Sequence, residues 1–185
     1  MPRLPLAEPR DGAEPAPLKL FRMVAHAESA YAPWLQYGGT LLTQLELDPL
    51  LRELAILQVA RRLDSHYEWV QHDPIARAVG ATGEQIDAIQ AGRDDDPAFD
   101  ADQSLVLRLT RTAVSEGAAS EEQVAELAER LGPRQLVELL LVIGNYTAIA
   151  MLIASTGLEP DPPLDSEQLL RARGDRPASR GGPGA

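Results

Sequence analysis

Residues 48–80, which read DPLLRELAILQVARRLDSHYEWVQHDPIARAVG, decide the fold of this chain. Asp48 can cap a helix that begins at Pro49, because its side chain accepts hydrogen bonds from free backbone N–H groups and proline suits the first helical position. Apolar residues recur at helical spacing on both sides of a short polar break. The stretch therefore predicts two consecutive helices, over 49–63 and 65–79, joined by a very short turn.

Similar signals predict helices along most of the chain. Thr82 and Ser120 each open a capping box, in which two side chains satisfy backbone donors at a helix start. Gly132 followed by Pro133 ends one helix and begins the next. No segment alternates apolar and polar residues for long enough to indicate a strand. The expected fold is all-α with about eight helices, near 18–27, 29–46, 49–63, 65–79, 83–91, 101–116, 121–131 and 134–155.

The distribution of proline and glycine predicts the domain organisation. Five of the 15 prolines lie in the first 17 residues, and the end of the chain finishes with ASRGGPGA. We expect an irregular arm over residues 1–16, one helical domain over 17–164, and a disordered tail over 165–185.

Composition excludes several classes of function. The formal net charge is −11 and no Lys/Arg cluster stands out, so nucleic acid is not an expected partner. The chain has no cysteine, which excludes disulfides, zinc–thiolate sites and thiol nucleophiles. The N-terminal segment lacks an apolar signal region, so we expect a cytoplasmic protein. The apolar run over 135–153 is interrupted by Glu138 and Asn145 and is expected to be a core helix, not a membrane span.

Three ionisable side chains fall on the apolar faces of the two decisive helices. On a helical wheel, Glu68 and His72 lie one turn apart within the apolar stripe of the second helix, and Glu53 lies within that of the first. Burying such groups is costly unless they are paired or functional. A carboxyl group beside an imidazole in a dry cleft is suited to proton transfer.

Other interpretations of these residues remain open. A Glu–His pair four residues apart is common on helix surfaces, and Glu53 could instead pair with Arg52 or Arg61 of its own helix. The two carboxylates and the imidazole could also ligate a metal, although no further histidine accompanies them.

The segment from Arg52 to Gly80 resembles the core motif of the carboxymuconolactone decarboxylase-like family, which includes the AhpD-type alkylhydroperoxidases. Their pattern is a glutamate on one helix, then Cys-x-x-Cys-x-x-x-His at the start of the next. Glu53 matches the glutamate and His72 the histidine, whereas Ser65 and Glu68 occupy the two cysteine positions. The chain therefore resembles a branch without the cysteine pair.

The resemblance implies a cofactor-independent acid–base enzyme that acts on a small carboxylated or lactone substrate, with no metal. It would catalyse decarboxylation, or a related isomerisation or elimination, and peroxidase activity is disfavoured because it requires the cysteines. The implied catalytic residues are His72, with Glu68 to orient it or share its proton, and Glu53 as a second acid–base group or a structural anchor. Substrate contacts are expected from Ser65, Tyr67, Trp69 and Tyr146.

The resemblance also implies an AhpD-like helical bundle that assembles as a homotrimer or homohexamer. The alternative from another class is a non-catalytic helical binding or assembly protein on the same scaffold. A closed, apolar-filled cleft around His72 would favour that alternative.

Overall fold

The computed structural model of the protein describes residues 2–8 and 16–163. This part of the chain is all-helical, as expected, and contains no strand. The expected tail over 165–185 lies outside the described residues. The helices are α1 (Lys19–Val24), α2 (Glu28–Thr43), α3 (Pro49–Arg62), α4 (His66–Ala78), α5 (Gly83–Ala91), α6 (Ala101–Glu116) and α7 (Glu121–Thr156).

The helix boundaries follow the capping signals closely. Asp48 accepts hydrogen bonds from the N–H groups of Leu50 and Leu51, and proline occupies the first position of α3. Capping boxes begin α5, α6 and α7. The backbone of Gly132 is non-helical, so α7 consists of two helical segments that meet at a kink. The two helices expected on either side of Gly132 are therefore present.

The helix α2 ends at Thr43, three residues earlier than expected. The chain then turns so that Leu47 enters the core, where it is 1% exposed. The carboxylate of Glu138 on α7 accepts a hydrogen bond from the Leu47 backbone N–H at 2.8 Å. The burial of Leu47 and this long-range hydrogen bond favour a change of chain direction at this point over a longer α2.

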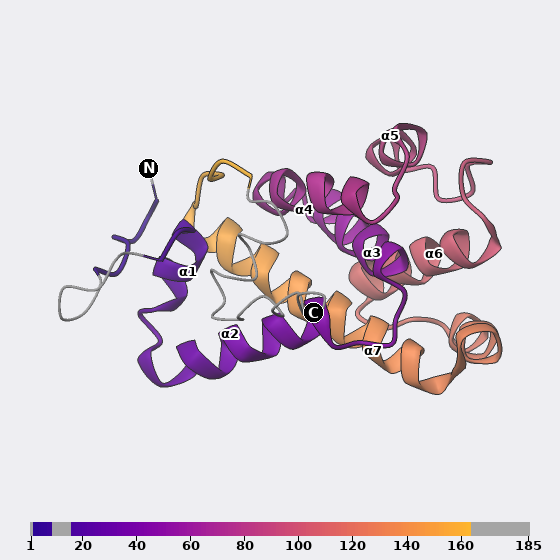
Figure 1. Ribbon diagram of the computed structural model, residues 1–185, viewed down its shortest axis with the longest axis horizontal. Helices are drawn as coiled ribbons and strands as arrows, with labels where there is room; N and C mark the ends of the chain where they lie inside the picture. The colour runs from indigo at the N-terminus through magenta and orange to yellow at the C-terminus, as the bar shows by residue number, and fades with distance from the viewer. Residues whose placement is uncertain (1, 9–15, 164–185) are drawn as a thin grey trace, which may run out of the picture.

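The helix α3 is the centre of the structure. It packs against α4, α6 and α7, which surround it in Figure 1. All ten residues from 51 to 60 are buried. A helix buried on every side must satisfy its polar side chains internally. This requirement applies to Arg52, Glu53 and Gln58.

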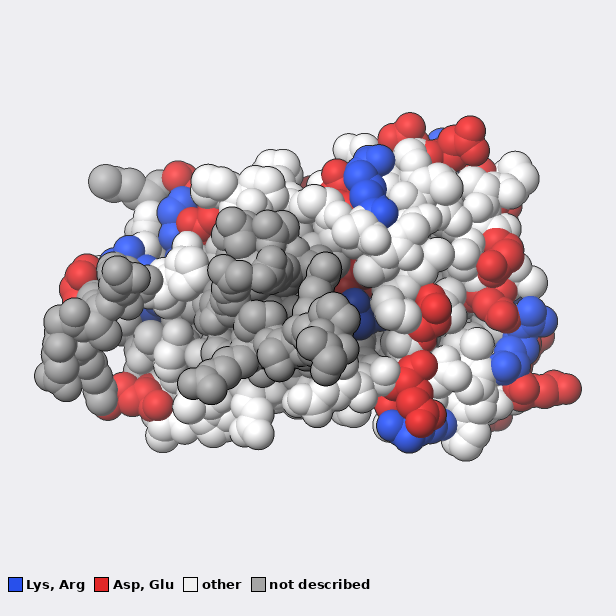
Figure 2. All heavy atoms as spheres, in the orientation of Figure 1, with Lys and Arg blue, Asp and Glu red and all other residues white. Residues whose placement is uncertain are grey.

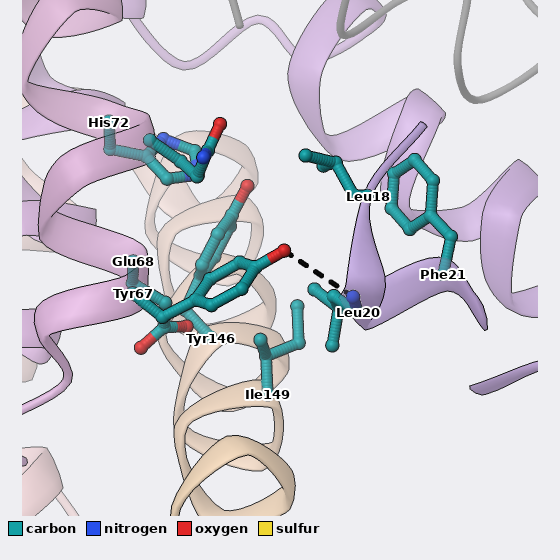
Figure 3. Close-up of a pocket in the computed structure, with 9 residues that line it drawn as sticks. Leu18, Leu20, Phe21, Tyr67, Glu68, His72, Tyr146 and Ile149 are labelled. Carbon is teal, nitrogen blue, oxygen red and sulfur yellow. Dashed lines mark hydrogen bonds between the residues drawn. The ribbon is translucent and has the colours of Figure 1, made fainter. Parts of the chain in front are cut away.

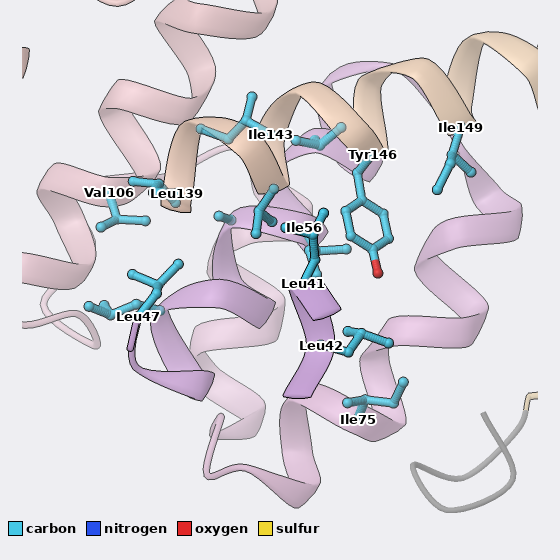
Figure 4. Close-up of a cluster of buried hydrophobic side chains, with 14 of the residues drawn as sticks. Leu41, Leu42, Leu47, Ile56, Ile75, Val106, Leu139, Ile143, Tyr146 and Ile149 are labelled. Carbon is cyan, nitrogen blue, oxygen red and sulfur yellow. The ribbon is translucent and has the colours of Figure 1, made fainter. Parts of the chain in front are cut away.

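Aliphatic side chains form most of the core. The larger cluster contains residues of α1, α2, α3, α4, α6 and α7. Among them are Leu41, Ile56 and Ile143, which are labelled in Figure 4. A smaller cluster lies between α3, α4, α5 and α6. The hydroxyl end of Tyr146 projects from the larger cluster toward α4, so the core also positions a polar group (Figures 3 and 4).

The described part of the N-terminal arm is held against the end of α7. The Arg3 backbone N–H donates to the Thr156 carbonyl at 2.7 Å. Its guanidinium donates to the carbonyls of Ala154 and Ser155, each at 2.7 Å. These carbonyls lie in the last turn of the helix, where a cation is favourable. Residues 2–8 form no helix, and these contacts hold them against the end of α7.

Within the described residues, α7 is long and apolar enough to cross a membrane by length and composition, although half of its most apolar window is buried in the protein. The buried residues of α7 face the main core. Its other face exposes several large apolar side chains, among them Val137, Leu141 and Met151. Acidic side chains gather instead over the end of the molecule formed by α5, α6 and the first part of α7 (Figure 2).

The kink in α7 provides a test of the fold. Gly132 has φ 81° and ψ 161°, a conformation that only glycine adopts readily. We expect Gly132→Ala to lower the free energy of unfolding by about 1–3 kcal/mol through backbone strain alone, since an added Cβ would contact nothing within 4 Å. Gly83→Ala is the matched control, because Gly83 lies in the first turn of α5 without positive φ, and it should be neutral or slightly stabilising. Equal stability of the two variants in urea denaturation would contradict the account of the kink.

Candidate functional site

The turn between α3 and α4 brings the sequence-predicted residues together. Asp64 adopts φ 52°, a left-handed conformation that aspartate tolerates better than most residues. The Ser65 backbone N–H donates to the Ala60 carbonyl at 2.8 Å, which closes the turn. As a result, α4 packs back on α3 and places Glu68 and His72 against the helix that carries Glu53.

Glu53 and His72 form a buried hydrogen bond. The distance from His72 Nδ1 to Glu53 Oε2 is 2.8 Å, and the two residues are 4% and 0% exposed. The other carboxylate oxygen of Glu53 accepts a hydrogen bond from Arg52 Nε at 3.0 Å. Arg52 also donates to the Leu42 carbonyl at 2.7 Å. The expected interior position of Glu53 and its pairing with Arg52 therefore occur together.

These contacts define the protonation of Glu53. Burial acts to raise the pKa of Glu53, but His72 and Arg52 outweigh it and lower the pKa below its ordinary value. An ionised carboxylate only accepts hydrogen bonds, so Nδ1 of His72 must be the donor. A neutral His72 then carries no proton on Nε2, which is free to accept one. Tyr146 packs edge-on against the ring, with ring centroids 4.8 Å apart.

Glu68 is in a different electrostatic environment from Glu53. Its side chain is 2% exposed, and neither carboxyl oxygen has a hydrogen-bond partner of good geometry among the described residues. Burial raises the pKa of Glu68 to about 8, and the nearby Ser65 hydroxyl opposes the shift only in part. Glu68 is therefore a buried carboxylic acid that holds its proton at neutral pH. Glu68 can therefore act as a proton donor, whereas Glu53 is a charged hydrogen-bond acceptor.

Glu68 and His72 line one small cavity between α1, α4 and α7 (Figure 3). Its volume is about 20 Å³, which is room for about one water molecule. Apolar side chains of α1 form the wall opposite α4. The residues that line the cavity are Leu18, Leu20, Phe21, Tyr67, Glu68, Gln71, His72, Tyr146 and Ile149.

The segment after α7 closes this region. The Tyr67 hydroxyl donates to Asp161 Oδ2 at 2.5 Å and accepts from the Leu20 N–H at 3.3 Å. The Lys19 backbone N–H also donates to Asp161 Oδ2, at 2.8 Å. Gln71 donates to the backbone carbonyl of Asp161 at 3.1 Å. The Asp161 carboxylate thus connects α1 and α4 to the segment that follows α7.

The expected substrate-contact residues lie in different environments. Ser65 is buried at the start of α4 beside Glu68, and Tyr146 lines the cavity. Tyr67 also lines it, although its hydroxyl is occupied by Asp161 and Leu20. Trp69 does not line the cavity and packs instead against the smaller core cluster.

The resemblance implied that Glu68 orients His72 or shares its proton, and in the structure Glu53 makes the hydrogen bond that orients the imidazole. Gln71 is 4% exposed and also lines the cavity. The segment around Asp161 packs over that side of α4. A helical wheel cannot predict burial by a segment that is distant in the sequence.

A buried polar network lies behind the site. Gln58 and Asp94 are 1% and 2% exposed, and they share a hydrogen bond of 2.8 Å. Arg111 of α6 forms a salt bridge with Asp94 at 2.6 Å. This polar network connects α3 to the loop that precedes α6.

The described residues include no group of three His, Asp or Glu side chains placed to hold a metal ion. Glu53 in particular already accepts hydrogen bonds from Arg52 and His72. The geometry therefore gives no support to the metal-site interpretation of the three residues.

Comparison with known protein families agrees with this arrangement. The model of the Carboxymuconolactone decarboxylase family matches residues 28–111. This region of the chain is similar to that family. The matched region extends from the start of α2 into α6 and contains Glu53, Glu68 and His72, with no cysteine in the chain. No curated protein matches the chain.

The shifted pKa of Glu68 should appear in the pH dependence of stability. An unfolded glutamic acid ionises near its ordinary pKa of ~4.3, whereas the folded one holds its proton until about pH 8. The folded state therefore binds more protons between these values, and this contribution to stability falls as pH rises from about 5 to 8, by at most ~1.4 kcal/mol per pH unit. Glu68→Gln should have a shallower decline in the free energy of unfolding over that range. Parallel curves for the two proteins would show that Glu68 is not held protonated.

Proposed function

We propose that the protein is a cofactor-independent enzyme that moves a proton on a small carbonyl or lactone substrate. The observation that carries this proposal is the buried hydrogen bond between Glu53 and His72, beside the protonated, unpartnered carboxyl of Glu68. Within the matched region, these groups provide a proton acceptor and a proton donor at one cavity.

Each residue has a defined role in the proposed reaction. His72 accepts a proton on Nε2 while Glu53 stabilises the resulting imidazolium through Nδ1. Arg52 is a positioning residue, because its guanidinium holds the Glu53 carboxylate in place. Glu68 donates a hydrogen bond or proton to the substrate oxygen on which negative charge develops. Ser65 and Tyr146 are further candidates to contact the substrate.

The reaction class follows from these groups. Decarboxylation leaves a carbanion or enolate that needs a proton, and isomerisation or elimination needs a proton removed from carbon. All three use the same acid and base, and none requires a thiol. Thiol-dependent peroxidase chemistry is not proposed, because Ser65 and Glu68 stand where that chemistry needs cysteines.

One observation favours the second candidate function, a non-catalytic binding or assembly protein. The cavity has room for about one water, so a substrate enters only if α1 or the segment near Asp161 moves. A scaffold that had lost its chemistry could remain closed in this way. The cost of burying an unpartnered Glu68 favours the enzyme, because a protein without catalysis has no use for that group.

Substitution of the acid and base tests the proposal. His72→Ala and Glu68→Gln should each reduce the turnover of an enolisable lactone by roughly 10²–10⁴-fold, the range that positioned proton transfer typically supplies. If both residues act in one proton-transfer unit, the turnover rate of the double variant should be only slightly lower than that of the less active single variant. The rate is followed by NMR as proton exchange or isomerisation of the lactone.

His66→Ala is the matched control, since His66 is exposed at the first turn of the same helix and should leave the rate unchanged. Glu53→Gln should reduce the rate by a comparable factor if Glu53 stabilises the imidazolium. If His72→Ala retains the wild-type rate while remaining folded, the acid–base assignment is wrong.

We also propose that the protein is a cytoplasmic homo-oligomer, a trimer or hexamer. The exposed face of α7 supports this proposal. Apolar or small residues repeat on it at alternating spacings of four and three, which places them in one stripe suited to helix packing. Soluble monomers rarely expose continuous apolar patches of this kind. The stripe consists of Val137, Leu141, Gly144, Ala148 and Met151.

Charges placed on this stripe should dissociate the assembly. Leu141→Glu combined with Met151→Glu should give a particle near the chain mass of 20.0 kDa, because two buried carboxylates would lack partners at the interface. Ala125→Glu, at an exposed position of α7 outside the stripe, should not change the mass. Light scattering at micromolar concentration measures all three proteins. A monomeric wild type would refute the assembly.

A further inference from the structure

A short segment of chain ties together two walls of the cavity that Glu68 and His72 line. Residues 159–163, called the strap below, read EPDPP and follow the C-terminal end of α7. In Figure 1 this segment runs from α1 to α4. The helix α1 forms one wall of the cavity and α4 forms another (Figure 3). The strap therefore bridges the two walls.

Consecutive carbonyls of the strap accept hydrogen bonds from both walls. The Lys19 ammonium of α1 donates to the carbonyls of the first two strap residues, at 3.4 and 3.3 Å. The Gln71 side chain of α4 donates to the next two carbonyls, each at 3.1 Å. Three of the five strap residues are proline, which has no N–H to donate. This composition suits a segment that is held through its carbonyls.

The Asp161 carboxylate is the central attachment of the strap. Its Oδ2 atom accepts hydrogen bonds from the Tyr67 hydroxyl at 2.5 Å and from the Lys19 backbone N–H at 2.8 Å. The Lys19 ammonium lies 3.7 Å from Oδ1. Burial and the Asp161 carboxylate both raise the pKa of Tyr67, so its hydroxyl remains a donor at neutral pH. One carboxylate therefore joins α1 to α4.

The same contacts cap the start of α1. Leu18 occupies the N-cap position and makes no side-chain cap, so the first N–H groups of the helix need other acceptors. The Lys19 N–H finds Asp161, and the Leu20 N–H finds the Tyr67 hydroxyl at 3.3 Å (Figure 3). Release of the strap would remove the first acceptor and free the second to move. The start of α1 would therefore loosen when the strap leaves.

The strap can leave at lower cost than α1 itself. Asp161 is the only buried residue among the five, so the strap is held mainly by hydrogen bonds, whose net contribution to stability is modest. In contrast, α1 buries Leu20, Phe21 and Met23, and burial of such side chains is strongly stabilising. Leu158, just before the strap, is part of the core and remains the fixed end. The strap is therefore the part of the closure that opens first.

We propose that the strap gates the cavity. With Asp161 in place, α1 and α4 are tied together, and the cavity between them has room for about one water molecule. When the strap leaves, the start of α1 separates from α4 and the ring of His72 becomes accessible to a larger molecule. This inference concerns access to His72 and does not depend on which reaction the site performs.

Chemical labelling of His72 tests the gate on the full-length protein. Diethyl pyrocarbonate transfers an ethoxycarbonyl group to an unprotonated imidazole nitrogen, and tandem mass spectrometry of peptides measures the rate at each of the three histidines. His72 is 4% exposed, so its labelling requires an opening, whereas the exposed His66 is an internal reference for the reagent. We expect Asp161→Ala to accelerate labelling of His72 by roughly 5–30-fold, the range expected from loss of a helix cap, with His66 unchanged.

Two further variants locate the effect at the strap. Tyr67→Phe removes the hydroxyl that joins the strap to α1 and should accelerate labelling of His72 by a similar factor. Combined with Asp161→Ala, it should add little, because both changes break one attachment. Asp73→Ala is the matched control. It removes a carboxylate of α4 that pairs with Arg77 on the surface, and it should leave the labelling rate of His72 unchanged.

The dependence on urea separates a local gate from unfolding. Release of a short strap exposes little surface, so urea below the unfolding transition should hardly change the labelling rate of His72 in the wild-type protein. A steep rise with urea would indicate labelling through global unfolding and would overturn the gate.

Equal labelling of His72 in the wild-type protein and in both strap variants would also overturn it. If Asp161→Ala does not fold, Tyr67→Phe decides the question alone. If the strap variants are labelled faster but His72→Ala keeps the wild-type turnover, the gate stands and the proposed acid–base function fails.

Discussion

The site depends on the buried hydrogen bond between Glu53 and His72. A carboxylate at 0% exposure is tolerated only because the imidazole and the Arg52 guanidinium both donate to it. The same bond fixes the position of α4 relative to α3 and, through the ionised carboxylate, determines which nitrogen of His72 carries the proton. One interaction therefore links the packing of the central helix to the chemistry that the site can perform.

Glu53 is buried as a paired anion, whereas Glu68 is buried as a neutral carboxylic acid. No described residue places a cation beside it, and burial raises the pKa of Glu68 to about 8 so that it remains neutral. The two glutamates lie on neighbouring helices, yet one is a stable anion and the other a stable acid, because only one has an arginine and an imidazole as partners. A site that contains both offers a hydrogen-bonded imidazole and a neutral carboxylic acid side by side.

The sequence predicted the parts of the structure that depend on local chemistry. Capping residues and Gly132 gave most helix boundaries, and helical periodicity placed Glu53, Glu68 and His72 inside. The partner of His72 and the burial of Gln71 and Asp94 were not predictable in this way. They depend on which distant segments pack together: α3 against α4, the chain at Asp161 against Gln71, and Arg111 against Asp94. A helical wheel shows which face of a helix is apolar, but it cannot show which polar group covers the next face.

The tautomer of His72 tests the central claim most directly. Two-bond ¹H–¹⁵N correlation spectra of the uniformly labelled protein report which ring nitrogen carries the proton, and His72→Ala assigns the signals among the three histidines. At a pH where the ring is neutral, we expect the proton on Nδ1, where Glu53 accepts its hydrogen bond, with Nε2 unprotonated. In Glu53→Gln this preference should weaken. A neutral His72 with its proton on Nε2 in the wild-type protein would contradict the account.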